Sequence, residues 1–170
     1  MIHDTGEIFH YNDGLPNLVG AVIANQSGKS LEAFTGEYLL NPIGIQEFKW
    51  EKASDGLNFG AFSFYLTPRD LEKTGKHMIQ SSNWEGKQIV DYTWITQATS
   101  IHSGADMPYG YYFWIVPSIE GCMMIGHGGQ ILFVCQSINL VVVNTAYPNT
   151  NDVLYDESVE LAEMKYRAAY

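Results

Sequence analysis

Short apolar runs joined by short polar connections dominate the chain after residue 108. Four of these runs are rich in β-branched and aromatic residues: Tyr109–Val116, Gly121–Gly126, Ile131–Cys135 and Asn139–Ala146. The connections are too short for a crossover helix, so the runs predict an antiparallel meander. Because Leu140–Val143 contains no polar residue, we expect helices to cover both faces of this sheet.

A glycine-rich connection, Gly126-His127-Gly128-Gly129-Gln130, joins the second run to the third. Paired glycines supply the positive φ that a tight hairpin turn needs. His127 stands at the mouth of this hairpin, beside a backbone that has no side chains to block a substrate. The arrangement suits a functional histidine, and a plain β-turn with a surface histidine is the alternative.

The chain has two cysteines, Cys122 and Cys135, which flank the glycine turn. If Gly128-Gly129 is a two-residue turn, the two cysteines are directly opposed across the strands. The pair then predicts either buried free thiols or a cross-strand disulfide. The cysteines lack the spacing of metal ligands, and the five histidines include no His-x-x-x-His pair. We therefore expect no metal and no other cofactor.

Helical periodicity characterises the residues that follow a short polar turn, Phe9–Gly14. Apolar residues recur at i, i+3, i+4, i+7 and i+8, which predicts an amphipathic helix. Pro16 fits its first turn, and Asn12 or Asp13 could cap it. The apolar face consists of Leu15, Leu18, Val19, Val22 and Ile23.

Cap residues mark the starts of four further helices. Ser30 should cap a helix that runs to about Leu40, where Asn41-Pro42 ends it. The capping box Thr67-Pro68-Arg69-Asp70 predicts a helix to about Ile79, with an inner face of Leu71, Gly75, Met78 and Ile79. Asp91 should begin a short helix that buries Trp94, Ile95 and Ala98. Asn151 or Asp152 should cap a final helix across the sheet, with the apolar stripe Tyr155, Val159, Ala162, Tyr166 and Ala169.

Helices followed by an antiparallel sheet and a terminal helix predict an α+β fold, with the sheet flanked by helices. The 170 residues suit one domain, with a mostly helical part over about 1–57 and the remaining helices and the sheet over about 58–170. The formal net charge of −10 and the absence of any basic cluster argue against a nucleic acid partner. No apolar run approaches the roughly 20 residues of a membrane span.

Few residues remain that could carry chemistry. The sequence lacks a phosphate-binding glycine loop in strand–loop–helix context, and it lacks Gly-x-Ser-x-Gly. The candidates are Tyr11, in the polar turn before the first helix, and His127. A tyrosine with its ordinary pKa near 10 is a poor base at neutral pH unless a neighbouring cation lowers that pKa. Tyr11 alone is equally consistent with a packing aromatic.

Several motifs nevertheless resemble the C-terminal part of a serine β-lactamase-related hydrolase, of the class C β-lactamase and penicillin-binding-protein type. They occur in the order and spacing of that family over nearly all 170 residues. The matching segments are Phe9–Asp13, Gly36–Ile45, Leu66–Leu71, Trp84–Gln88, Tyr109–Tyr111 and Gly126–Gln130. The resemblance implies a β-lactamase/DD-peptidase-like fold that is N-terminally incomplete in this chain, and a periplasmic or extracellular location.

The resemblance also implies roles for individual residues. Tyr11 matches the catalytic tyrosine of the family's Tyr-x-Asn motif, while Asp13 replaces its asparagine, adding a negative charge at a substrate-binding position. His127, Gly128 and Gly129 match the family's Lys-Thr-Gly motif in its histidine form. Gln130 falls where a backbone N–H of the oxyanion hole is supplied. The implied substrate is a small-molecule amide or ester: a β-lactam, a D-alanyl peptide or a small ester.

The family's nucleophile motif, Ser-x-x-Lys, does not occur in the sequence, because no lysine has a serine three positions before it. In the family this motif precedes the tyrosine turn. We therefore expect an N-terminally truncated portion of a hydrolase that acts through an acyl-enzyme, inactive alone and served by a chain that supplies the missing part. The alternative is a non-catalytic degenerate relative or a gene fragment that acts at most as a binding module. Truncation would also leave the helical face around Val19, Val22 and Ile23 partly uncovered.

Overall fold

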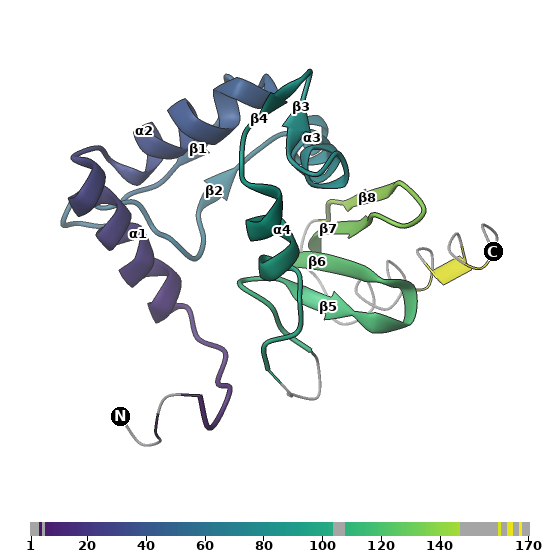
Figure 1. Cartoon of the computed structure of the whole chain (residues 1–170). Helices are drawn as coiled ribbons and strands as arrows, with labels where there is room; N and C mark the ends of the chain where they lie inside the picture. The colour runs from purple at the N-terminus through teal and green to yellow at the C-terminus, as the bar shows by residue number, and fades with distance from the viewer. Residues whose placement is uncertain are drawn as a thin grey trace. The chain divides into compact units, whose positions relative to one another are not determined.

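The computed structural model describes residues 4, 6–103, 108–146, 160, 163, 164 and 167. The chain divides into two compact units, Met1–Thr67 and Pro68–Tyr170 (Figure 1). The stripe expected for the final helix, from Tyr155 to Ala169, lies outside the described residues. In the part of the chain that is described, no helix combines the length and the apolar character that crossing a membrane requires.

The first unit contains the helices α1 (Gly14–Ser27) and α2 (Leu31–Thr35). The Ser30 Oγ accepts a hydrogen bond from the Ala33 N–H at 3.1 Å, as expected for a cap. The second helix does not end at Asn41-Pro42. It continues through the π-helical turn η1 (Gly36–Leu40) and the 3₁₀ turn η2 (Asn41–Ile43), and Gly44 ends it in the left-handed region at φ 75°. A short antiparallel pair, β1 (Lys49–Trp50) and β2 (Phe64–Tyr65), completes the unit.

Helix α1 has the predicted extent, but its apolar face is exposed. Leu15, Leu18, Val19 and Val22 each expose between 42% and 60% of their surface. The helix packs instead through Gly20, where an added Cβ would lie 2.9 Å from the Leu31 Cδ2 in α2. An uncovered face at Val19 and Val22 agrees with the sequence expectation.

The second unit begins with α3 (Pro68–Ile79), which has the bounds that the capping box predicts. A small hairpin of β3 (Asn83–Trp84) and β4 (Lys87–Gln88) follows, and then α4 (Tyr92–Ala98), whose Thr93 N–H donates to the Asp91 Oδ1 at 2.8 Å. Ile95 and Ala98 are buried as predicted. The predicted burial of Trp94 is wrong, because its ring is half exposed and stacks on Tyr111.

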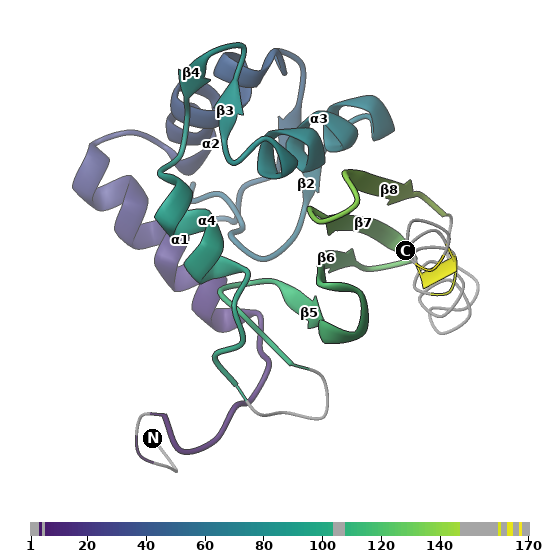
Figure 2. The same cartoon turned by 45° about the vertical axis from the view of Figure 1, so that its right-hand side comes forward.

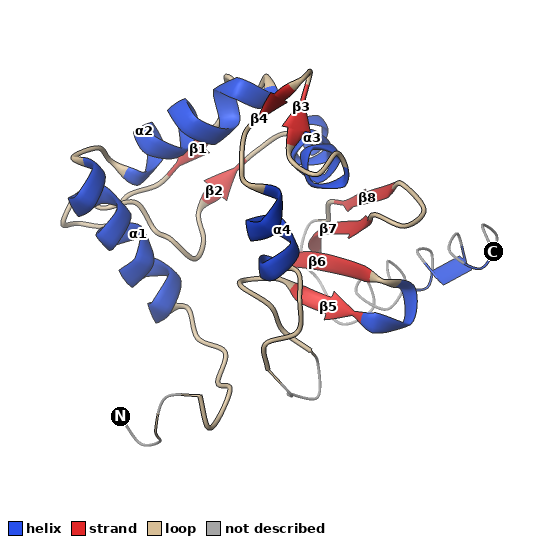
Figure 3. Cartoon of the chain, viewed as in Figure 1, coloured by secondary structure: helices blue, strands red, loops and turns tan. Residues whose placement is uncertain are grey.

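The sheet of the second unit is the predicted antiparallel meander, in the order β5-β6-β7-β8 (Figure 3). Its strands are β5 (Trp114–Val116), β6 (Gly121–Gly126), β7 (Gln130–Cys135) and β8 (Leu140–Asn144), and the 3₁₀ turn η3 (Pro117–Ile119) joins the first two. The first strand is shorter than the predicted run, because the chain turns back at Gly110, whose N–H donates to the Phe113 carbonyl.

Alternating side chains of the strands form two apolar clusters, one on each face. Helix α3 lies against β7 and β8 and covers one face, where Met78 packs with Cys122, Leu132 and Val134 (Figure 2). The other face carries Met123, Phe133 and Cys135, which pack with Ile119 of η3. The sequence predicted helices on both faces of the sheet, and α3 confirms this for the first face.

The register of the β6–β7 hairpin corrects the prediction for the cysteines. Gly126 pairs with Gln130, so the turn has three residues, His127–Gly129, and not the two of Gly128-Gly129. Cys122 therefore pairs with Val134, and Cys135 pairs with Gly121. A shift of one residue reverses the face on which a side chain lies. The cysteines consequently belong to opposite clusters, and both are free thiols and buried.

Candidate active site

The β6–β7 turn holds His127 at the end of the sheet. Gly128 and Gly129 have φ angles of 76° and 81°, in the left-handed region that favours glycine, and both are buried. His127 is exposed. The Gln130 Nε2 donates to the Gly128 carbonyl at 3.3 Å and also to the Ala146 carbonyl, which follows β8. These contacts fix the turn against the neighbouring strand and leave the imidazole facing solvent.

The turn that carries Tyr11 is fixed by asparagine side chains. The Asn12 Oδ1 accepts hydrogen bonds from the N–H groups of Gly14 at 3.0 Å and Leu15 at 3.1 Å, whereas the Asp13 side chain makes no capping hydrogen bond. Of the two predicted candidates, Asn12 is therefore the cap. One turn later the Asn17 Oδ1 accepts from the Gly60 N–H at 2.7 Å. Only glycine fits at residue 60, since a Cβ there would lie 2.1 Å from the Pro16 carbonyl oxygen.

The electrostatic environment of Tyr11 keeps its phenol protonated. Partial burial raises the pKa of Tyr11, and the nearby negative charge of Asp13 raises it further. Both effects oppose ionisation, whereas a tyrosine that acts as a base at neutral pH needs a lowered pKa. Asp13, which the sequence placed at a substrate-binding position, thus acts directly on the predicted catalytic tyrosine.

The predicted site residues lie in two groups. His127, Gly128, Gly129 and Gln130 form one turn in the second unit, and Tyr11 lies with Asp13 in the first. That the two groups share one active site stays a prediction. Within the described residues, no three His, Cys, Asp or Glu side chains gather as the ligands of a metal would.

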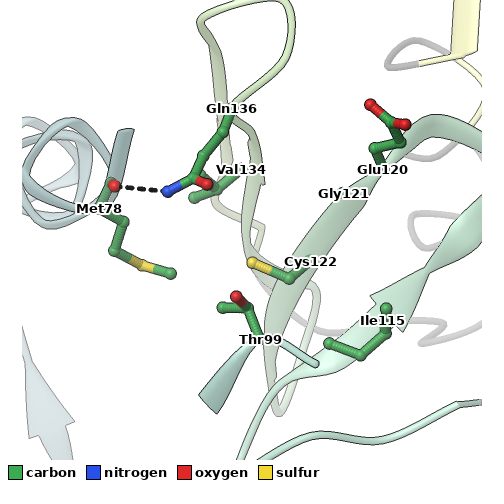
Figure 4. Close-up of a pocket in the computed structure, with 8 residues that line it drawn as sticks. All are labelled: Met78, Thr99, Ile115, Glu120, Gly121, Cys122, Val134 and Gln136. Carbon is green, nitrogen blue, oxygen red and sulfur yellow. Dashed lines mark hydrogen bonds between the residues drawn. The ribbon is translucent and has the colours of Figure 1, made fainter. Parts of the chain in front are cut away.

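Figure 4 shows a pocket in the second unit whose lining includes Gly121 and Cys122 at the start of β6. His127 follows the other end of this strand. The volume of the pocket is about 240 Å³, and its lining also includes Met78 and Gln136, whose Nε2 donates to the Met78 carbonyl at 2.8 Å. Burial raises the pKa of the Cys122 thiol to about 12, so this group is a poor nucleophile at neutral pH. None of the predicted site residues, Tyr11, Asp13 and His127–Gln130, lines this pocket.

Two polar or aromatic clusters of the second unit escaped the sequence analysis. The His77 Nε2 and the Ser82 Oγ lie 2.6 Å apart in the interior, and the Val90 N–H donates to the same hydroxyl at 2.7 Å. The rings of Trp94, Tyr111 and His102 form a stack at the surface. The Tyr109-Gly110-Tyr111 motif could have indicated an aromatic cluster. It could not have identified Trp94 and His102 as the rings that stack on Tyr111.

No protein-family model matches the sequence, and no curated protein matches it. Solved structures do match. A protein assigned as a 6-aminohexanoate-dimer hydrolase from Bacillus anthracis is 20% identical, with a TM-score of 0.83 over 94% of this chain and 44% of its own. Simvastatin synthase (LovD) from Aspergillus terreus is 14% identical, with a TM-score of 0.75 over 97% of this chain and 56% of its own. A β-lactamase from Mycobacterium bovis is 14% identical, with a TM-score of 0.74 over 95% of this chain and 67% of its own.

A penicillin-binding protein homologue from Pyrococcus abyssi is also similar, with a TM-score of 0.66. The chain spans about half the length of the first two structures, 44% and 56%. At these identities the likeness establishes the fold. The chain has the β-lactamase/penicillin-binding-protein fold over the part that it spans, as the resemblance of its motifs implied.

Proposed function

We propose that the chain is the C-terminal portion of a β-lactamase-like serine hydrolase that cleaves an amide or ester bond through an acyl-enzyme. The observation that carries this proposal is the fold likeness over 94% of the chain, combined with a histidine-bearing glycine turn at the end of its sheet. The substrate would be a β-lactam, a D-alanyl peptide or a small ester. The nucleophile would come from a Ser-x-x-Lys segment outside these 170 residues.

Each candidate residue has a distinct role in the proposed reaction. Tyr11 accepts the proton of the serine hydroxyl as the hydroxyl attacks the carbonyl carbon, and it returns that proton to the leaving group. His127 provides a second polar group beside the reacting atoms. The Gln130 N–H donates to the oxyanion of the tetrahedral intermediate. Gly128 and Gly129 leave the backbone open to the substrate, and Asp13 contacts the substrate.

Under this proposal, the raised pKa of Tyr11 must be reversed by a cation from the Ser-x-x-Lys segment. In the 170-residue chain, burial and Asp13 both favour the neutral phenol. A lysine placed beside Tyr11 by a Ser-x-x-Lys segment would reverse that preference, because an opposite charge within hydrogen-bonding distance favours the ionised form. The tyrosine would then become a competent base only when the segment is in place.

A chimera tests the proposal. The N-terminal part of a protein of the same fold, chosen because its sequence carries Ser-x-x-Lys, is fused ahead of residue 1, and the chimera and the 170-residue chain are treated with a fluorophosphonate probe. We expect mass spectrometry to find stoichiometric labelling of the motif serine in the chimera and none in the 170-residue chain. In the chimera, Y11F should reduce the labelling rate by about a hundredfold or more, as is typical for loss of a general base. Y38F alters another exposed tyrosine of the first unit and should leave the rate unchanged.

A non-catalytic binding module is the second candidate, favoured by the raised pKa of Tyr11 and the lack of a Ser-x-x-Lys motif in the sequence. A folded chimera that resists the probe would support this alternative. Labelling of another serine in the 170-residue chain would contradict the need for an outside nucleophile.

A further inference from the structure

Three rings of the second unit form a continuous stack at its surface. The ring centroids of His102 and Tyr111 lie 4.1 Å apart with an interplanar angle of 6°, and those of Tyr111 and Trp94 lie 5.6 Å apart at 30°. Tyr111 occupies the middle, so one face of each outer ring points away from the stack. Trp94 is 52% exposed and Tyr111 42% exposed. Large aromatic surface therefore remains in contact with water in a pre-ordered arrangement.

Backbone contacts hold the rings in place. The Tyr111 N–H donates to the Ala98 carbonyl at 2.8 Å, and the His102 N–H donates to the Tyr109 carbonyl at 2.9 Å. The His102 Nε2 lies 2.7 Å from the Gln97 carbonyl oxygen, which fixes the orientation of the imidazole. Gly110 permits the close approach of the two segments, because a Cβ there would lie 2.2 Å from the Ala98 carbonyl oxygen. Ordering the rings in advance lowers the entropy lost when a ligand binds.

The stack lies toward the same end of the sheet as the glycine turn. Trp114 of β5 pairs with Met123 of β6, and β6 runs on from there to Gly126. Because the strands are antiparallel, the residues that precede Trp114 extend toward the end of β6 that leads into His127. Tyr111 is one of these residues. Tyr111 thus lies toward the end of the sheet that carries the glycine turn.

The charge of the chain favours a cationic occupant. Lys29 lies over the Tyr38 ring at 5.1 Å and Lys49 over the Tyr65 ring at 5.2 Å, so two exposed tyrosines of the first unit already have cations. Within the described ranges, no lysine or arginine lies over the rings of the stack. The net charge of −10 attracts cations and repels anions, and tryptophan offers the most favourable ring face for a cation.

We propose that Trp94, Tyr111 and His102 form a binding platform for the flat, cationic aromatic ring of a small ligand. The ring stacks on the free face of Trp94 and extends the existing stack by one member. Aromatic overlap and the attraction between the positive ring and the indole face both contribute. A saturated cation would keep the attraction to the indole face and lose the aromatic overlap. This binding is independent of the hydrolytic activity proposed above.

Binding of N-methylquinolinium to the 170-residue chain tests the platform, with isothermal titration and ligand-observed NMR as readouts. We expect saturable binding that W94A weakens by about tenfold, the loss typical of a removed cation–π partner. W94F keeps a ring and should weaken binding less than W94A. Y92A is the matched control, since Tyr92 is 51% exposed on the same helix but lies outside the stack, and it should leave the affinity unchanged.

Cyclohexyltrimethylammonium, a cation without an aromatic ring, separates aromatic overlap from the attraction between a cation and the indole face. We expect it to bind about threefold to tenfold more weakly than N-methylquinolinium, because it lacks the aromatic overlap. Equal affinity for the two cations would overturn the proposal, as would an equal loss in W94A and Y92A or the absence of saturable binding. Far-ultraviolet circular dichroism and thermal melts of each variant check that the fold is retained, which is expected because residue 94 is half exposed.

Discussion

Replacing Gly75 with alanine sets helix propensity against packing at the interface between α3 and the sheet. In an exposed helix interior, alanine is more favourable than glycine by about 1 kcal/mol. Gly75 is buried, however, and an added Cβ would lie 2.6 Å from the Val141 Cγ1 and 3.0 Å from the Leu132 Cδ1. If these methyl groups can move away, the alanine stabilises the protein, and if they cannot, it destabilises the protein.

The surrounding side chains leave little room for such movement. In any χ1 rotamer, the β-branched Val141 keeps at least one methyl group at one of the two positions that lie 2.6 Å and 3.2 Å from the new Cβ. Leu132 is 1% exposed and is confined by the core. Overpacking of this kind costs about 2 kcal/mol. Subtracting the gain in helix propensity, we expect G75A to lower the free energy of unfolding by about 1 kcal/mol.

A double-mutant cycle with V141A tests the cause. V141A alone should lower the free energy of unfolding by about 1 kcal/mol, because Val141 is half buried. With the valine methyls removed, only the Leu132 Cδ1 at 3.0 Å still crowds the new Cβ, so G75A should destabilise the V141A protein less than it destabilises the natural protein. Urea unfolding followed by circular dichroism measures all four proteins, and K76A, at an exposed neighbouring position, is the control. A stabilising effect of G75A in the natural background, or strict additivity of the two changes, would refute the reasoning.

Three further predictions concern other parts of the chain. Burial lowers the pKa of His77, so the unfolded chain binds a proton near pH 6.5 that the folded chain does not. The free energy of unfolding should therefore decrease as the pH falls through about 6.5, an effect that H77Q removes and H10Q does not, as measured by thermal melts. Iodoacetamide at pH 7.5 should label neither cysteine in the folded chain, and it should label both cysteines in denaturant without reductant. Fewer than two labelled cysteines in denaturant would restore the disulfide alternative. The exposed apolar face of α1 should cause the chain to associate as its concentration rises, as measured by light scattering, and L18K/V22K should abolish this association. A natural chain that stays monodisperse at high concentration would contradict this prediction.

Local sequence signals predicted where the helices α2, α3 and α4 begin. The capping box at residues 67–70 places the start of α3, and Ser30 caps α2, because a cap depends only on neighbouring residues. The order of the meander follows from its short connections. The exact turn did not follow, since His127-Gly128-Gly129 can close a hairpin with two or three residues. That single residue decides which face carries Cys122 and which carries Cys135.

Interactions between distant segments were beyond prediction from local patterns. Helical spacing placed Trp94 in the core, but Gly110 brings Tyr111 close enough to stack on it at the surface. The hydrogen bond between His77 and Ser82 likewise depends on the turn that follows α3. For the candidate site, the polarity of the Tyr11 turn and the openness of the glycine turn are local properties. Only the resemblance of the motifs links Tyr11 with His127, because no local pattern relates residues so far apart in the chain.

The charge of Asp13 leads to a last prediction, about the proton on Tyr11. A tyrosine with an ordinary pKa near 10 must be shifted by about 3 pKa units to act as a base at pH 7, which requires about 4 kcal/mol. One cation at about 4 Å supplies about that amount at an effective dielectric constant of about 20. A single lysine is therefore sufficient only if no nearby anion opposes it. Solvent screening at the half-exposed Tyr11 weakens the attraction further.

Removing the opposing anion should therefore be measurable in the 170-residue chain. Asp13 raises the pKa of Tyr11, so D13N should lower that pKa toward the ordinary value, although burial continues to raise it. NMR titration of the tyrosine Cζ resonances, with Tyr11 assigned through Y11F, measures the change. D55N removes a carboxylate that is not among the charges acting on Tyr11 and serves as the matched control. If D13N leaves the titration of Tyr11 unchanged, Asp13 does not govern its proton. The departure from the family's asparagine would then affect substrate contact alone.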